Sequence, residues 1–168
     1  MMNLSECDFL RRFYAGEAKR FKIKIAACLL LMEQGKICLQ RRQGTGIDDG
    51  WYTIPMGGVE SGERPMETLI REAKEEIGID LSPEDVRLGH AMYRRHTMPD
   101  GYIFYQQDLF FCVSSYGGVV QNLELHKADD VRFFSLQELP EKLVPHIKQA
   151  IGCALRGEFY SEFGFIPK

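Results

Sequence analysis

The pattern of apolar and polar positions divides the chain into short extended and helical segments. Residues 21–32 contain the apolar run IAACLLLM, and residues 36–42 form a second apolar segment after a turn at Gly35. Runs of this length, bounded by turn residues, predict buried strands. Two longer segments, 86–97 and 102–113, flank the turn-forming sequence MPDG, so we expect them to form a hairpin.

Three other segments predict helices: residues 5–19, 64–77 and 141–155. Pro65 fits the first turn of the middle helix, and Gly78 fits the position just past its end. At about 100° per residue, the apolar side chains of this helix fall on one arc that should face the core. These side chains are Met66, Leu69, Ile70, Ala73 and Ile77.

The remaining segments complete an α/β pattern. Residues 43–50 should form a loop, and residues 51–55 and 131–136 should form short strands. Strands interrupted by helices, with at least one hairpin, favour a mixed β-sheet covered by helices on two sides.

The length of 168 residues suits a single domain over residues 1–168. We expect its core to span about 21–155, with the first helix and an aromatic C-terminal tail as decorations. The tail could pack against the domain or against a partner subunit, and the second arrangement would make a homodimer.

Charge and cysteine content restrict the setting in which the chain acts. The net charge of −3 gives no general electrostatic reason to bind a nucleic acid polymer or an anionic membrane. Five scattered cysteines without a CxxC pair suggest buried thiols in a reducing compartment. The start of the chain lacks a signal-peptide pattern, and no apolar run is long enough to span a bilayer, so we expect a cytoplasmic protein.

The middle helix gathers three carboxylates, Glu72, Glu75 and Glu76, on an arc beside the apolar stripe. Like charges at these spacings repel by about 0.2–0.5 kcal/mol per pair. A solvated acidic face with surface ion pairs is one explanation, but Arg71 and Lys74 fall outside the glutamate arc. Clustered, partly shielded carboxylates are instead what Mg²⁺ or Mn²⁺ requires.

The sequence PMGGVESGE precedes this helix, and its glycines allow a tight loop that can approach a ligand closely. From Gly57 to Ile79 the chain reads GX5EX7REAXEEXGI. This pattern resembles the Nudix box, the signature of the Nudix (MutT-like) hydrolases. Ala73 is the one departure, since the family has a larger aliphatic residue there. The resemblance implies the family's α/β/α sandwich over most of the chain.

The resemblance also implies a reaction, the metal-dependent hydrolysis of a nucleoside diphosphate linked to another group. Glu75 and Glu76 would be direct metal ligands, and Glu72 would be a further ligand or the base that activates water. Arg71 would hold a box glutamate in place by an ion pair. The other expected metal-site groups are Glu63, as a supporting acid, and the backbone carbonyl near Gly57.

Some members of the family use a further acid from a late loop. The first candidate here is Glu124, followed by Asp129 or Asp130. The alternative is a polar surface loop without a catalytic role.

Phosphate and base contacts should come from positively charged and aromatic residues outside the box. On a strand, Arg41 and Arg42 point to opposite faces, so at most one of them should reach the site. Core packing and solvated strand ends are the alternative explanations. The candidates are Arg41, Trp51, Arg94 and Arg95.

The box does not determine the substrate, and the chain carries no clear mark of a particular subfamily. We expect a small nucleotide substrate, either a (deoxy)nucleoside triphosphate or a related diphosphate. ADP-ribose or another nucleotide sugar is the second expectation. A non-catalytic Nudix domain that senses a nucleotide is the third, although such domains usually lose box glutamates.

Overall fold

The computed structural model describes residues 4–98 and 100–165. The helices are α1 (Leu4–Lys19), α2 (Pro65–Ile77) and α3 (Pro145–Leu155), with a short 3-10 turn at Pro83–Asp85. The strands are β1 (Lys24–Leu30), β2 (Met32–Glu33), β3 (Lys36–Arg42), β4 (Tyr52–Thr53), β5 (Met56–Gly58), β6 (Val86–Thr97), β7 (Ile103–Val113), β8 (Ala128–Ser135) and β9 (Tyr160–Phe163). None of the helices in this part of the chain combines the length and apolar character needed to cross a bilayer.

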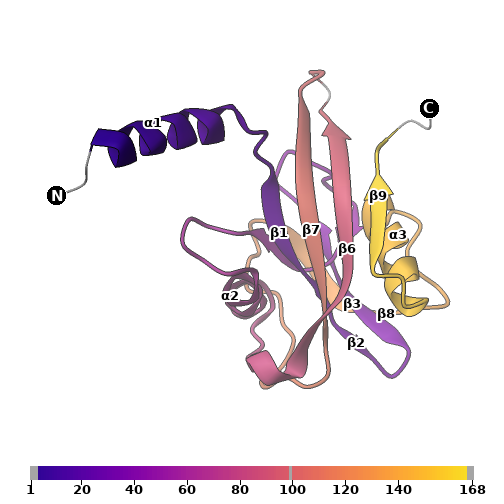
Figure 1. The fold of residues 1–168 in the computed structure, drawn as a ribbon. Coiled ribbons are helices and arrows are strands. Elements are labelled where there is room, and N and C mark those ends of the chain that lie inside the picture. The colour runs from indigo at the N-terminus through magenta and orange to yellow at the C-terminus, as the bar shows by residue number, and fades with distance from the viewer. Residues whose placement is uncertain (1–3, 99, 166–168) are drawn as a thin grey trace.

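A five-stranded mixed sheet forms the centre of the molecule, in the order β5-β1-β7-β6-β9 (Figure 1). Strand β1 lies parallel to β7 and antiparallel to β5. Strands β6 and β7 form the predicted hairpin, which is therefore confirmed. Strand β9 adds to β6 in parallel.

Strands β2, β3, β4 and β8 form a second, smaller sheet in which β3 is central. The turn between β2 and β3 places Gln34 at φ 48° and Gly35 at φ 73°. Two successive positive φ angles match the twist of a tight hairpin, which explains the glycine at this turn.

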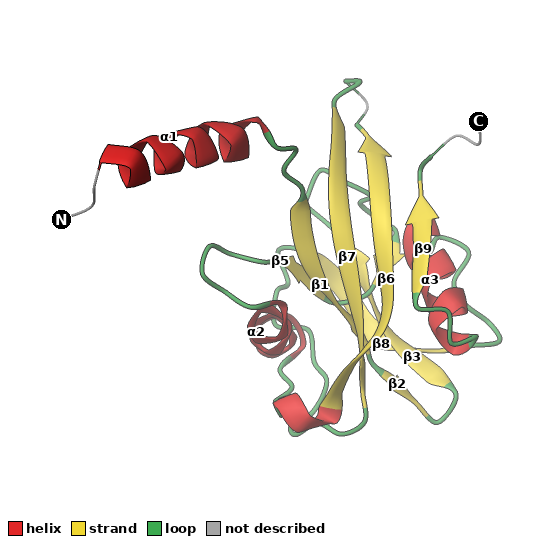
Figure 2. Ribbon diagram, viewed as in Figure 1, coloured by secondary structure: helices red, strands yellow, loops and turns green. Residues whose placement is uncertain are grey.

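Helices α2 and α3 cover opposite faces of the five-stranded sheet (Figure 2). The alternation of side chains along β1 builds both cores, because successive residues of a strand point to opposite faces. Ala26, Cys28 and Leu30 pack in the core that contains α3, and Ala27, Leu29 and Leu31 pack in the core that contains α2. The expected α/β/α sandwich is therefore confirmed, with its strands divided between two sheets.

The structure differs from the sequence expectation in three segments. Residues 56–58, expected as loop, form β5 against β1, and part of the aromatic tail forms β9. Helix α3 begins at Pro145 and not at residue 141. Leu143 instead forms an isolated bridge with Tyr52, because Lys142 O and Val144 N hydrogen-bond the Tyr52 backbone.

The described cysteines are free thiols, as expected for a reducing compartment. Cys28, Cys38 and Cys153 are buried, and Cys112 is half-buried. Burial raises the pKa of the Cys38 thiol to about 12. These thiols are therefore inert packing groups at neutral pH. The side chain of Cys7 lies outside the described residues.

Candidate active site

Helix α2 is fixed at both ends and along its apolar face. Its start is closed by Glu67, whose Oε2 accepts the backbone N–H of Arg64 at 2.8 Å. Its end is closed by Gly78 at φ 76° and by a hydrogen bond from Ile79 N to Ala73 O at 3.3 Å. This Schellman-type ending needs a left-handed residue, which glycine supplies without strain. The helix therefore presents its carboxylates from a rigid support.

Arg71 is the centre of a network that joins three glutamates. Its Nε and Nη2 atoms donate to the two oxygens of Glu63 at 3.0 and 3.2 Å. Its Nη1 atom donates to Glu72 Oε1 at 2.6 Å and to Glu75 Oε2 at 3.2 Å. Together with the Thr68 hydroxyl, Arg71 lowers the pKa of Glu63 to about 2.

The sequence expectation that Arg71 lies outside the glutamate arc is therefore wrong for its guanidinium group. The backbone position of Arg71 is displaced from the arc, but its long side chain extends across the helix surface to Glu72 and Glu75. Helical angles place the Cα atom and do not include the reach of the side chain.

Glu76 is held differently, because its carboxylate is buried between α2 and the strands. Its Oε2 accepts hydrogen bonds from Met56 N at 3.0 Å and from Gln40 Nε2 at 3.1 Å. Burial, followed by the nearby charge of Glu72, raises the pKa of Glu76 to about 8. A bound cation would offset this unfavourable burial of charge.

Gly57 lies directly against the carboxyl group of Glu72. A Cβ atom at residue 57 would overlap the Glu72 side chain, whereas a Cβ atom at Gly58 would meet no atom within 4 Å. Only glycine allows the backbone of β5 to come this close to a helix carboxylate.

The late loop brings one acid to the same place. The backbone N–H of Leu123 donates to Glu76 O at 3.0 Å, which ties the loop to α2. Glu124 Oε1 accepts from Lys127 Nζ at 2.7 Å. Glu124 Oε2 is buried and has no hydrogen-bond partner among the described residues. The charge of Glu124 also contributes to the raised pKa of Glu76, which places the two acids near one another.

The two other late acids face elsewhere. Asp129 pairs with Arg41, with Nε to Oδ1 at 2.7 Å. Asp130 accepts from Tyr52 Oη at 2.5 Å and pairs with Arg132 at 2.9 Å. Of the three acids considered from the sequence, the structure brings only Glu124 to the box carboxylates.

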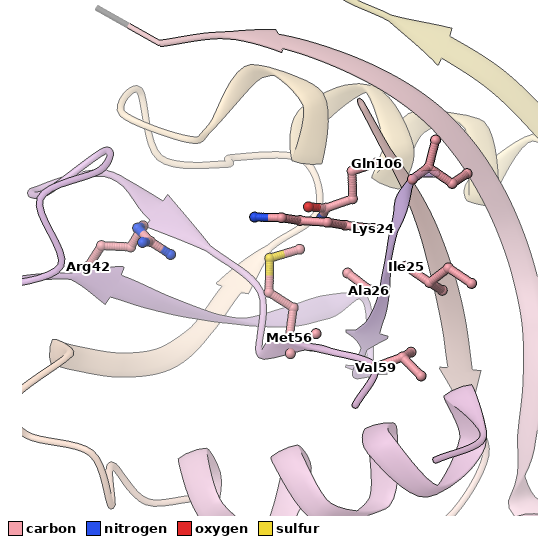
Figure 3. A pocket seen from close by; sticks show the side chains of 10 residues that line it. Lys24, Ile25, Ala26, Arg42, Met56, Val59 and Gln106 are labelled. Carbon is pink, nitrogen blue, oxygen red and sulfur yellow. The ribbon is translucent and has the colours of Figure 1, made fainter. Parts of the chain in front are cut away.

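A cavity of about 720 Å³ opens beside β5 (Figure 3). Lys24, Met56 and Gln106 extend into it, and Arg42 approaches it from β3. A second cavity of about 150 Å³ shares Arg42 and Met56 with the first. Its lining includes Thr53, Arg94, His96, Phe104 and His146. The local positive charge that an anionic ligand needs is thus present although the whole chain is acidic.

The residues predicted from the sequence to contact substrate are only partly brought together. The structure does not bring Arg41 to either cavity; Arg42 takes that place, because the two side chains point to opposite faces of β3. Arg94 lines the smaller cavity as a buried side chain paired with Asp108 at 2.7 Å. Arg95 and Trp51 line neither of these two cavities.

Sequence reasoning missed Lys24, Gln40, Met56 and Gln106. The sequence does contain a signal for Lys24. It lies two positions before Ala26 on β1, so its side chain points to the same face of the sheet as that of the buried Ala26. The other three depend on which strands become neighbours, and a single sequence does not show that.

The acidic groups have the chemistry of a divalent-cation site. Glu63, Glu72 and Glu75 are joined through Arg71, Glu72 lies against the Gly57 backbone, and Glu124 has an oxygen that is buried without a partner among the described residues. Such hard oxygen donors suit Mg²⁺ or Mn²⁺. As they stand, however, no three or more acidic, histidine or cysteine side chains of the described residues are grouped so that they could hold a metal ion. Arg71 instead holds oxygens of Glu63, Glu72 and Glu75.

Comparison with known proteins identifies the family. The family model of the NUDIX domain matches residues 22–151, which is most of the chain. The chain therefore belongs to the Nudix family, as the box pattern predicted.

Curated relatives and solved structures agree with this assignment. The chain is 41% identical over 69 residues to an RNA pyrophosphohydrolase of Halorhodospira halophila, covering 40% of this chain and 35% of that protein. It is 42% identical over 81 residues to an RNA pyrophosphohydrolase of Marinomonas sp., covering 42% of this chain and 48% of that protein. The matched segments thus span less than half the length of these relatives.

The fold is similar to that of a MutT NUDIX hydrolase from Burkholderia pseudomallei, with a TM-score of 0.69 and 20% identity. That match covers 79% of this chain and 98% of the other. A MutT protein from Methanosarcina mazei gives a TM-score of 0.66 at 20% identity, over 82% and 97% of the two chains. At this identity the likeness concerns the fold alone.

Proposed function

We propose that this protein is a divalent-metal-dependent pyrophosphohydrolase that cleaves a phosphoanhydride bond in a nucleoside diphosphate linked to another group. The observation that carries the proposal is the set of box carboxylates at β5, with Glu72 against the Gly57 backbone and Glu76 bonded to Met56 N, beside a cavity lined by Lys24. Family membership and the printed names of the curated relatives support the same reaction class.

The residues of the chain divide the work between holding a cation, positioning acids and binding phosphate. Glu63, Glu72, Glu75 and Glu76, with the Gly57 carbonyl, would hold Mg²⁺ or Mn²⁺. When bound, the cation supplies charge neutralisation at phosphate oxygens and lowers the pKa of water. The remaining roles belong to Arg71, which orients the carboxylates, and to Arg42, which would face the phosphate chain from β3.

A base is needed to take a proton from the attacking water. Glu124 is our first choice, because its Oε2 is buried without a partner among the described residues. Glu72 is the second choice, since Arg71 and Gly57 fix its carboxylate. An acid from the late loop approaches the site from a different element than α2 does.

We favour a small nucleotide as substrate, a (deoxy)nucleoside triphosphate or related diphosphate, with ADP-ribose as the next candidate. The 5′ end of an RNA is a further candidate, because the curated relatives are RNA pyrophosphohydrolases. The net charge of −3 gives no extended electrostatic attraction for a polymer. The free thiols of the described cysteines support a reducing, cytoplasmic setting.

A screen of phosphoanhydrides tests the proposal. Nucleoside triphosphates, ADP-ribose and a 5′-triphosphate RNA are incubated with Mg²⁺, with Mn²⁺ or with excess chelator, and phosphate and pyrophosphate release is measured. We expect release with metal and none with chelator. Full turnover in excess chelator would overturn the metal requirement. Nucleotide binding without turnover of any compound would instead favour the sensing domain.

A further inference from the structure

Three polar side chains form a row across the five-stranded sheet at the cavity. In the strand register Lys24 on β1 lies beside Gln106 on β7, and Gln106 lies beside Arg94 on β6. Directly paired residues on neighbouring strands share a face. Asp108 follows Gln106 by two positions on β7 and therefore lies on that face as well.

Asp108 fixes the orientation of the Gln106 side-chain amide. Its carboxyl group is fully buried and accepts Arg94 Nε at 2.7 Å and Gln106 Nε2 at 2.6 Å. A carboxylate paired with an arginine has acceptors only, so the amide must turn its NH₂ group toward Asp108. The reverse orientation would place two oxygen atoms against each other in a buried site, which is costly.

The consequence is a fixed hydrogen-bond acceptor in the wall of the cavity. With Nε2 held by Asp108, Gln106 Oε1 faces the space that Lys24 enters (Figure 3). Lys24 is exposed, and its ammonium group lies 5.4 Å from the centre of the Phe104 ring. The wall thus offers a fixed acceptor next to a positive charge.

We propose that Gln106 is a specificity-determining residue, and that its Oε1 accepts a hydrogen bond from the exocyclic amine of a nucleobase. The inference rests on the proposed nucleotide site. Asp108 and Arg94 act as positioning residues, because they hold the amide in one orientation. Lys24 complements the ring nitrogen acceptor that neighbours the amine in adenine and cytosine.

The preference for bases with an exocyclic amine follows from the fixed orientation of the Gln106 amide. A base with an oxygen in place of the amine, such as hypoxanthine or uracil, would set that oxygen against Gln106 Oε1. The amide cannot rotate to offer its NH₂ group without breaking its contact with Asp108. A polar group left unmatched in this way costs about as much as a lost hydrogen bond.

Binding of nucleoside monophosphates tests the inference. Dissociation constants are measured by calorimetry for AMP against IMP and for CMP against UMP. The wild-type protein should bind the amine-bearing member of each pair roughly tenfold more tightly. Gln106→Met should reduce both ratios to within about twofold, because the hydrogen-bond acceptor is lost. Gln107→Met is the matched control, since Gln107 is the next residue of β7 and does not line the cavity.

The positioning role of Asp108 is tested by measuring the same binding ratios for Asp108→Asn. Asp108→Asn can turn its amide either way, so it no longer dictates the orientation of Gln106. We expect the AMP/IMP and CMP/UMP ratios of this variant to fall toward one, because the amide of Gln106 can then turn either way. Thermal unfolding checks that each variant is folded, and Gln106→Asn replaces Gln106→Met if the latter does not fold.

The outcomes separate this inference from the proposed function. Three results would overturn the inference. The first is that Gln106→Met weakens the binding of both members of a pair equally. The others are that the wild-type protein prefers IMP and UMP, or binds none of the four nucleotides. A wild-type protein that shows the amine preference but hydrolyses no phosphoanhydride would overturn the proposed function and leave the inference intact.

Discussion

Glu76 is the acid of α2 whose environment differs most from water. It is buried, it accepts hydrogen bonds from Met56 N and Gln40, and its charge has no cationic partner among its described hydrogen bonds. We expect Glu76→Gln to lower kcat by roughly 10²-fold or more, comparable with the loss of a main electrostatic stabiliser. Above about pH 8, where the metal-free carboxyl group is ionised, its melting temperature should be no lower, because a buried charge is removed while an acceptor for Met56 N–H remains.

The control for this prediction is Lys74→Gln on the same helix. Lys74 is exposed and pairs with Asp80 at 2.8 Å, away from the carboxylates. Steady-state kinetics of the two variants should therefore differ strongly. Similar kinetics would contradict the placement of Glu76 in the metal site.

Glu124 provides the second test at the scale of one residue. If it takes the proton from the attacking water, Glu124→Gln should lower kcat much more than it raises KM, because the loss falls on the transition state. The measurement uses one substrate at a pH of about 8–9, where a carboxylate base is ionised. Asp129→Asn and Asp130→Asn are the matched controls. Unchanged kcat in all three variants would assign the base to Glu72.

At the scale of elements, the contact between β5 and α2 decides where Glu72 lies. A methyl group at Gly57 would overlap the Glu72 carboxyl group, so we expect Gly57→Ala to displace the Glu72 side chain. Because small misplacements of reacting groups are costly, kcat should fall by roughly 10²-fold. Gly58→Ala adds the same methyl group in open space and should stay close to wild type. Kinetics and a Mg²⁺ titration of both variants check this, and equal effects would contradict it.

The elements that the sequence predicted well are those with local signals. Helix α2 was predicted within one residue, because its apolar stripe, Pro65 and Gly78 are all close in the chain. Strands β5 and β9 were missed, because each becomes a strand only through pairing with β1 or β6, far away in the sequence. The spacing of Glu72, Glu75 and Glu76 placed them on one helix, and α2 contains all three. The contacts of Arg71 and the position of Arg42 required side-chain directions that spacing does not contain.

At the scale of the whole molecule, buried His146 couples stability to pH. Burial, together with the nearby charges of Arg94, His96 and Arg42, lowers the pKa of His146 from 6.5 to about 3. Between these values the unfolded chain binds a proton that the folded chain does not, so the contribution of His146 to the free energy of unfolding decreases as pH falls below 6.5. This contribution should fall by about 2 kcal/mol by pH 5. Glu76, whose raised pKa acts in the opposite direction over the same range, offsets it in the wild-type protein.

Urea unfolding at several pH values between 5 and 7 measures this effect. His146→Phe removes the titrating group, so the difference in free energy of unfolding between the variant and the wild type should change by about 2 kcal/mol over that range. His126→Gln, at an exposed position, should keep the wild-type slope. A slope that His146→Phe leaves unchanged would contradict the assignment.

Strand β9 has a consequence for how the protein behaves in concentrated solution. Its residues Tyr160–Phe163 pair with Ala91–Arg94 of β6 and so occupy the backbone hydrogen-bonding groups on the outer side of that strand. A chain cut before Tyr160 would leave those groups open, and an open strand of this kind is a template for pairing with another molecule. The tail thus moves the edge of the sheet from the long strand β6 to the short strand β9, and shortening the tail should reduce solubility before it affects chemistry at the carboxylates.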